Sequence, residues 1–101
     1  MYIYNITTKV DWSIHEEWRA WMEETHMPAV LGTGCFDKHQ FVRVLDIDET
    51  EGPTYAIQYY TSTMARYNHY INAHAPVLRE ATHVKWGERV ISFRSLMEIV
   101  D

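Results

Sequence analysis

The stretches His26-Met27-Pro28-Ala29-Val30 and His74-Ala75-Pro76-Val77-Leu78 are two copies of one short signature, and together they decide the fold. With six His and three Pro among 101 residues, chance would produce about 0.2 His-x-Pro triplets. Each copy follows an aromatic-rich stretch with helical periodicity. Each of those stretches follows a strand-like run, residues 2–6 in the first half and 55–59 in the second. The repeat therefore indicates internal duplication of a strand–helix unit.

The elements around the two signatures follow from local patterns. Residues 2–10 alternate as a strand does. Ser13 followed by Glu16 forms a capping-box pattern and predicts a helix from Ile14, which Pro28 ends or kinks. The remaining expected elements are strands over residues 36–47, 54–61 and 89–100, and a second helix that Ser62 or Thr63 caps and Pro76 bends.

The predicted order is βαββαβ, which makes residues 1–101 a single α+β domain. Two split βαβ halves build a ferredoxin-like fold, a four-stranded antiparallel sheet with two helices on one face. In that fold Asn5 matches Gln58 on the central strands, and Arg43 matches Arg94 on the edge strands.

Composition limits the classes of function. The net charge of −5 argues against a nucleic-acid or anionic-membrane partner, and no apolar run is long enough to span a membrane. Aromatic residues make up 14% of the chain, which is more than a small monomer is expected to bury, so a homodimer is expected. The single Cys35 excludes an internal disulfide. Together with a strand pattern that begins at residue 2 and leaves no room for a signal peptide, it favours the cytoplasm.

His26 and His74 are the first candidates for chemistry, because they occupy equivalent positions at the two helix bends. In a structural role, an imidazole N–H would satisfy a carbonyl that the following proline leaves free. In a functional role, the two rings would act as acid/base or ligand groups at the ends of a pocket between helices and sheet. A solvated ring without a role is the third possibility.

The polar residues Asn5, Gln58 and Arg94 interrupt otherwise apolar strands and are the second candidates. If they share the sheet face that carries no helices, they form either a hydrogen-bond network in a dimer interface or a site for a small anion or carbonyl ligand. Arg94 or Arg43 would hold such an anion. A register error of one residue reverses this assignment of faces.

Other motifs point to no chemistry. Asp46-x-Asp48-x-Thr50 matches a phosphatase loop, but the chain has no room for the parallel sheet that this chemistry needs. The pair Cys35 and His39 fits no zinc spacing. His69 and His74 are five positions apart and are not expected to share a helical face, so neither a metal nor a cofactor is expected. The remaining aromatic stripe is expected to be core rather than a cofactor site; it comprises Trp18, Trp21, Tyr67 and Tyr70.

Taken together, the opening Tyr-Ile-Tyr-Asn, the Trp18-x-x-Trp21-Met22 helix, the two His-x-Pro signatures and the Ser92-Phe93-Arg94 strand resemble a family of short bacterial proteins of unknown function. That family supplies no catalytic residue. At fold level the chain also resembles the dimeric α/β-barrel group, which includes cofactor-free monooxygenases, muconolactone-isomerase-like proteins and some haem enzymes. This resemblance implies two sheets packed face to face, and it does not fix a function.

Two functions remain open. The first is a homodimeric domain that binds a small ligand or a partner and catalyses no reaction. The alternative is a cofactor-free oxygenase or isomerase acting on an aromatic or enol metabolite, with an apolar cavity of some hundreds of Å³. In the alternative, His26 or His74 is the base, Arg94 or Asn5 stabilises the oxyanion, and Trp21 and Tyr70 form the pocket wall.

Overall fold

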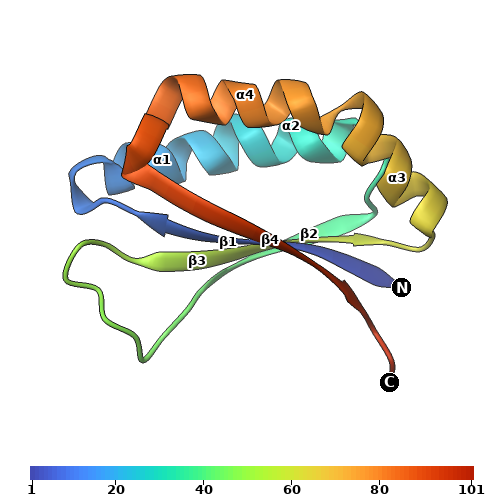
Figure 1. Ribbon diagram of the computed structural model, residues 1–101, viewed down its shortest axis with the longest axis horizontal. Helices are drawn as coiled ribbons and strands as arrows, with labels where there is room; N and C mark the ends of the chain where they lie inside the picture. Colours follow the sequence, from blue (N-terminus) through green and yellow to red (C-terminus); the bar gives the residue numbers. More distant parts are fainter.

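The computed structural model describes residues 1–101 and contains one antiparallel sheet with the strand order β2-β3-β1-β4. The strands are β1 (Tyr2–Val10), β2 (Lys38–Arg43), β3 (Thr54–Thr61) and β4 (Val90–Glu98). The helices are α1 (His15–Trp21), the π-helical turn η2 (Met22–His26), α2 (Met27–Gly32), α3 (Met64–Ala73) and α4 (Ala75–Trp86), with short 3-10 turns η1 (Trp12–Ile14) and η3 (Gly87–Arg89). All the helices lie on one side of the sheet (Figure 1), so the predicted ferredoxin-like α+β fold is confirmed.

The two halves of the chain are related as the repeat predicts. The central strands β1 and β3 pair with Asn5 directly opposite Gln58, and this arrangement places a local two-fold axis between them. The helical segment of each half is divided at its His-x-Pro signature: α2 begins at Met27 and α4 at Ala75, each with a proline in its first turn. Proline suits that position because the first-turn N–H has no partner inside the helix.

The core lies between the helices and the inner face of the sheet. Tyr4, Ile57 and Tyr59 point from the central strands to meet Trp18 of α1 and Tyr70 of α3, and all five are almost fully buried. The aromatic rings are in contact with one another; Tyr4, for example, lies 5.8 Å from Tyr70 between ring centroids. Burial of Trp18 and Tyr70 fits the expectation that the aromatic stripe is core.

Three local details differ from the sequence expectations. The Asp11 side chain, rather than Ser13, caps the first helical turn by accepting from the Ser13 N–H. Residues 44–47 do not continue strand β2. Strand β4 ends at Glu98, two residues before the expected end of the last strand. Beyond the break at His74, Ala75, Leu78 and Trp86 of α4 pack on the core.

The outer face of the sheet carries no helix (Figure 1). Ile91 and Phe93 of β4 pair with Lys9 and Thr7 of β1 and share this outer face. Both apolar side chains are more than 60% exposed. An uncovered sheet face with such side chains is a surface against which a second layer can pack.

Candidate functional site

A cavity of about 50 Å³ lies between the helices and the inner face of the sheet. At roughly 10–15 Å³ for each water, this cavity has room for about four water molecules. Its lining is mostly apolar with a few polar groups; the residues are Tyr4, Ile6, Thr8, Trp18, Met22, His26, Ile57, Tyr59, Tyr70, Leu78, Arg79, Thr82, Val90, Ser92 and Arg94.

The π-helical turn brings His26 to this cavity. Trp18, Met22 and His26 follow one another at intervals of four residues, and all three line the cavity. In a regular α-helix such a series drifts around the axis, whereas the wider π-helical turn keeps its members in one row. The His26 ring also stacks on Trp21, with 4.9 Å between the ring centroids, so Trp21 supports the histidine from outside the cavity.

The charged groups of the cavity are all basic. Arg94 of β4 and Arg79 of α4 line it together with His26, and no Asp or Glu does. Arg79 donates a hydrogen bond to the Tyr4 hydroxyl at 3.0 Å, and neither arginine belongs to any of the four ion pairs of the chain. An apolar cavity with two guanidinium groups and no carboxylate is suited to an anion.

Burial, with the nearby Arg94 charge, lowers the pKa of His26 to about 4. At neutral pH the ring is therefore uncharged, with one nitrogen that donates and one that accepts a hydrogen bond. The ring makes no capping hydrogen bond to α2, and that of His74 makes none to α4. Neither imidazole thus caps the helix that follows it.

One buried residue of the cavity lining has an unpaired hydroxyl. Tyr59 is fully buried and lines the cavity, and its hydroxyl has no hydrogen-bond partner in the chain. Burial raises the pKa of Tyr59, so its hydroxyl stays protonated at neutral pH. By contrast, Thr8 and Ser92 satisfy each other across β1 and β4 at 2.9 Å. A buried hydroxyl without a partner is uncommon and is a group that a bound molecule or a water can satisfy.

The sequence-predicted candidates do not all meet in one place. His26, Arg94 and Tyr70 line the cavity. His74 does not, so the two histidines do not stand at the two ends of one pocket. Its ring is directed instead toward His69, with ring centroids 5.3 Å apart.

Asn5 and Gln58 lie on the opposite face of the sheet from Arg94. The Gln58 amide donates to Asn5 at 3.2 Å, and the Tyr60 hydroxyl donates to Gln58 at 3.3 Å. Arg94 pairs with Ile6 of β1 and lines the cavity, so it belongs to the inner face. The three residues therefore do not share the outer face, because edge strand β4 is in the register that turns Arg94 inward.

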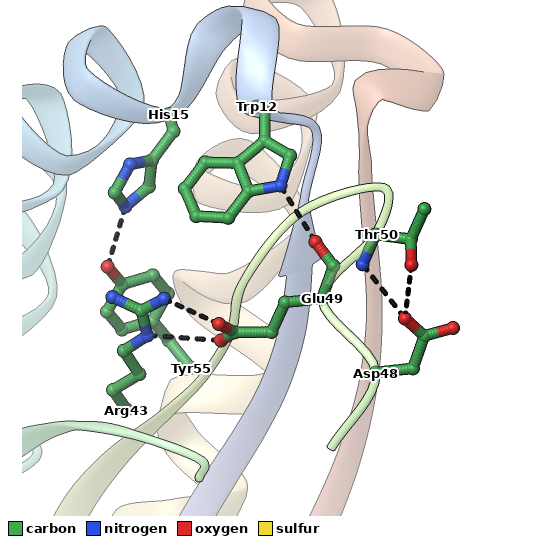
Figure 2. A network of polar contacts seen from close by, with 7 residues as sticks. All are labelled: Trp12, His15, Arg43, Asp48, Glu49, Thr50 and Tyr55. Carbon is green, nitrogen blue, oxygen red and sulfur yellow. Dashed lines mark hydrogen bonds and ion pairs between the residues drawn. The ribbon is translucent and has the colours of Figure 1, made fainter. Parts of the chain in front are cut away.

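Arg43 is held in a separate network beside β3 (Figure 2). Its guanidinium donates to both carboxylate oxygens of Glu49, at 2.8 and 3.1 Å. The Trp12 indole N–H donates to the Glu49 carbonyl oxygen at 2.8 Å, and His15 and the Tyr55 hydroxyl lie 2.6 Å apart in the same network (Figure 2). With Glu49 as its counterion, Arg43 fixes the β2–β3 loop and is not available to hold an anion.

The sequence reading missed Arg79 and Thr82 of α4, which line the cavity. A signal was present in the sequence. The positions Ala75, Leu78, Thr82 and Trp86 repeat at intervals of three and four, which is a helical face, and Arg79 lies beside it. This face begins anew after the break at His74, so the helical periodicity of α3 does not extend to it.

The comparisons with known proteins agree with this fold. A family model described as a domain of unknown function, DUF4286, matches residues 1–100. The chain belongs to the DUF4286 family. No curated protein matches it. Among solved structures, an ethyl tert-butyl ether d (EthD) family protein from Bacillus halodurans C-125 is similar, with a TM-score of 0.70 and 11% identity over 99% of this chain and 100% of that one. At this identity the likeness concerns the fold alone.

The family membership assigns no reaction to this chain, and none follows from the likeness in fold. None of the helices of this DUF4286 protein has the length and apolar character that crossing a membrane requires.

Proposed function

We propose that this DUF4286 protein is a homodimeric domain that binds a small ligand and catalyses no reaction, and that it works in the cytoplasm. The ligand is a single-ring molecule with one anionic group, bound between the helices and the sheet. The outer sheet face packs against a second copy of the chain. The cytoplasmic location rests on the lone Cys35, which can form no internal disulfide.

The observation that carries the ligand proposal is the charge of the cavity. Arg79 and Arg94 have no carboxylate partner, and His26, which lines the same cavity, is neutral at pH 7. The apolar walls formed by Trp18, Met22 and other side chains suit a ring, while the guanidinium groups suit a carboxylate, sulfonate or phosphate. The unpaired hydroxyl of Tyr59 offers the ring substituent one further hydrogen bond.

The enzymatic alternative has less support. The cavity expected for it, of some hundreds of Å³, is larger than the one present, of about 50 Å³, so a substrate beyond a single ring has no room. It also needs a histidine base held by an orienting carboxylate or carbonyl. His26 rests on Trp21 through ring stacking, which positions the imidazole and does not raise its basicity.

The proposal is tested with benzoate and benzamide, two rings of nearly the same shape that differ in charge. Benzoate is expected to shift the NMR signals of cavity residues and to raise the melting temperature, whereas benzamide is expected to bind at least about tenfold more weakly because it offers no charge to Arg79 and Arg94. The measurement is a titration followed by two-dimensional NMR.

Substitutions localise the effect. Arg94→Gln is expected to remove most of the difference between benzoate and benzamide, since glutamine keeps the hydrogen bond but not the charge. Arg19→Gln is the matched control, because Arg19 of α1 is exposed and pairs with Glu23 of η2. Equal binding of the two probes, or unchanged preference in Arg94→Gln, would contradict an anion site at this cavity.

A further inference from the structure

Three side chains with metal-binding atoms converge outside the cavity. The Cys35 thiol and one nitrogen of each of His69 and His74 all lie within 4.8 Å of one another. These residues come from the segment after α2, from α3 and from the junction between α3 and α4. Their convergence is a property of the fold, because Cys35 is more than 30 positions from either histidine.

The helix break at His74 brings the two histidines together. In an unbroken helix, residues five apart lie on different faces. His74 leaves the helical conformation, with φ −120° and ψ −39°, and α4 begins again at Ala75. This change turns the His74 ring back toward His69, where the rings meet edge to face. The break therefore brings the two rings together although the residues are five positions apart.

The first half of the chain supplies the thiol. Gly34 adopts a positive φ of 76°, a left-handed conformation that turns the chain back after α2 and that glycine adopts without strain. The following Cys35 is buried, and its backbone N–H is held by the Thr33 hydroxyl at 3.3 Å. The sulfur atom is thus fixed on the protein side of the cluster, while the His69 ring is exposed to solvent.

We propose that Cys35, His69 and His74 form a zinc site with one open coordination position. In tetrahedral zinc with thiolate and imidazole ligands, neighbouring ligand atoms lie about 3.3–3.6 Å apart. From the observed limit of 4.8 Å, the ligand atoms have to approach one another by at most about 1.2–1.5 Å to reach that range, a movement of the size that side-chain rotation supplies. Three protein ligands leave a fourth position, which water or a small ligand fills from the exposed side.

The donor types select the metal. One sulfur and two imidazole nitrogens, with no carboxylate in the group, disfavour Mg²⁺ and Ca²⁺ and suit Zn²⁺. Cys35 binds the metal as a thiolate and not as a thiol, so it loses its proton to solvent as zinc binds. The zinc ion together with its thiolate and two neutral imidazoles then carries a net charge of about +1. The Tyr70 ring stacks on His74 with 6.3 Å between centroids and restrains its orientation.

The site is tested with Co²⁺, which takes the place of zinc and reports its ligands by colour. Addition of Co²⁺ to the wild-type chain is expected to produce visible bands of four-coordinate cobalt together with a near-ultraviolet thiolate-to-cobalt band, and Zn²⁺ is expected to displace both. Zinc affinity is then measured by competition with a chromophoric chelator.

Variants identify the ligands. His69→Ala is expected to lower zinc affinity at least about tenfold, the lower bound of what even an outer-shell change costs. Because His69 is exposed, this variant keeps the fold. Cys35→Ser is expected to abolish the thiolate band, with circular dichroism used to check that it folds. His83→Ala, an exposed histidine of α4, is the control and is expected to bind as the wild type does.

Two results would overturn the zinc site. One is a wild-type chain that produces no thiolate-to-cobalt band; the other is a His69→Ala variant that binds zinc as tightly as the His83→Ala control. Rapid alkylation of Cys35 without any cobalt spectrum would identify a cysteine–histidine pair in place of a metal site. None of these outcomes depends on whether the benzoate cavity exists.

Discussion

At the scale of single residues, burial of His26 makes the stability of the fold depend on pH. The unfolded ring takes up a proton near pH 6.5 and the folded ring only near pH 4. Between these values the unfolded chain binds more protons, so the stability contributed above about pH 6.5 is lost as the pH falls toward 4. From pH 7.5 to pH 5 the loss from this ring is about 2 kcal/mol.

Urea denaturation at several pH values checks this expectation. His26→Gln, which cannot titrate, is expected to flatten the dependence of the unfolding free energy on pH by about that amount. His83→Gln is the matched control, because His83 is exposed, and it should keep the wild-type slope. Parallel curves for His26→Gln and the wild type would mean that the folded ring accepts a proton as readily as the unfolded one.

The repeated His-x-Pro signature predicted some features of single residues and not others. It placed His26 and His74 at equivalent positions, and the helical segments of both halves are divided there. The repeat could not reveal that the two rings would have different surroundings. His26 ends a π-helical turn with helical φ and ψ, whereas His74 lies outside the helical region. That difference of backbone sends one ring to the cavity and the other to Cys35.

At the scale of elements, Gly52 controls how the β2–β3 loop lies against the end of β1. A Cβ atom at this position would lie 1.7 Å from the Val10 carbonyl oxygen. The close approach belongs to a loop contact in which the Val10 N–H donates to the Pro53 carbonyl at 3.0 Å. Because backbone atoms meet backbone atoms here, no side-chain rotation can relieve the overlap.

Gly52→Ala is therefore expected to lower the unfolding free energy by at least about 3 kcal/mol, or to prevent folding. Gly32→Ala is the control: a Cβ there meets nothing within 4 Å and its φ is not positive. It is expected to raise stability by about 0.5–1 kcal/mol, because alanine restricts the unfolded chain. Chemical denaturation of both variants measures the difference, and equal stabilities would show that the loop moves away at little cost.

Elements were also where sequence reasoning worked best. The alternation of apolar residues predicted β3 at the bounds observed, and Thr63 caps α3 as expected by accepting from the Arg66 N–H. The facing of Arg94 could not be predicted, since the register of β4 is set by its pairing with β1 and not by its own sequence. Arg79 could not be predicted for a similar reason: the break at His74, and not the sequence of α4 alone, decides which face of α4 turns toward the cavity.

At the scale of the whole molecule, the fold has one covered and one bare sheet face (Figure 1). The bare face combines a central hydrogen-bonded pair, Asn5 and Gln58, with the exposed apolar side chains Ile91 and Phe93 along β4. The topology could be predicted from the order of elements. The partner of the bare face could not be predicted, because exposed side chains in one chain fit a second copy of the chain, another protein or solvent.

The dimer is tested by introducing a charge at Phe93, which is 63% exposed on the bare face. Phe93→Glu is expected to convert a dimer into a monomer in light scattering, because two copies related by symmetry would bury the introduced carboxylates close together without partners. Val77→Glu is the matched control, since Val77 is 73% exposed on α4 and faces away from the sheet; it should leave the mass unchanged.

A wild-type chain that is monomeric at micromolar concentration, or a dimer that tolerates Phe93→Glu, would exclude this face as the interface. The benzoate site would then belong to a single chain, since every residue lining that cavity comes from one copy.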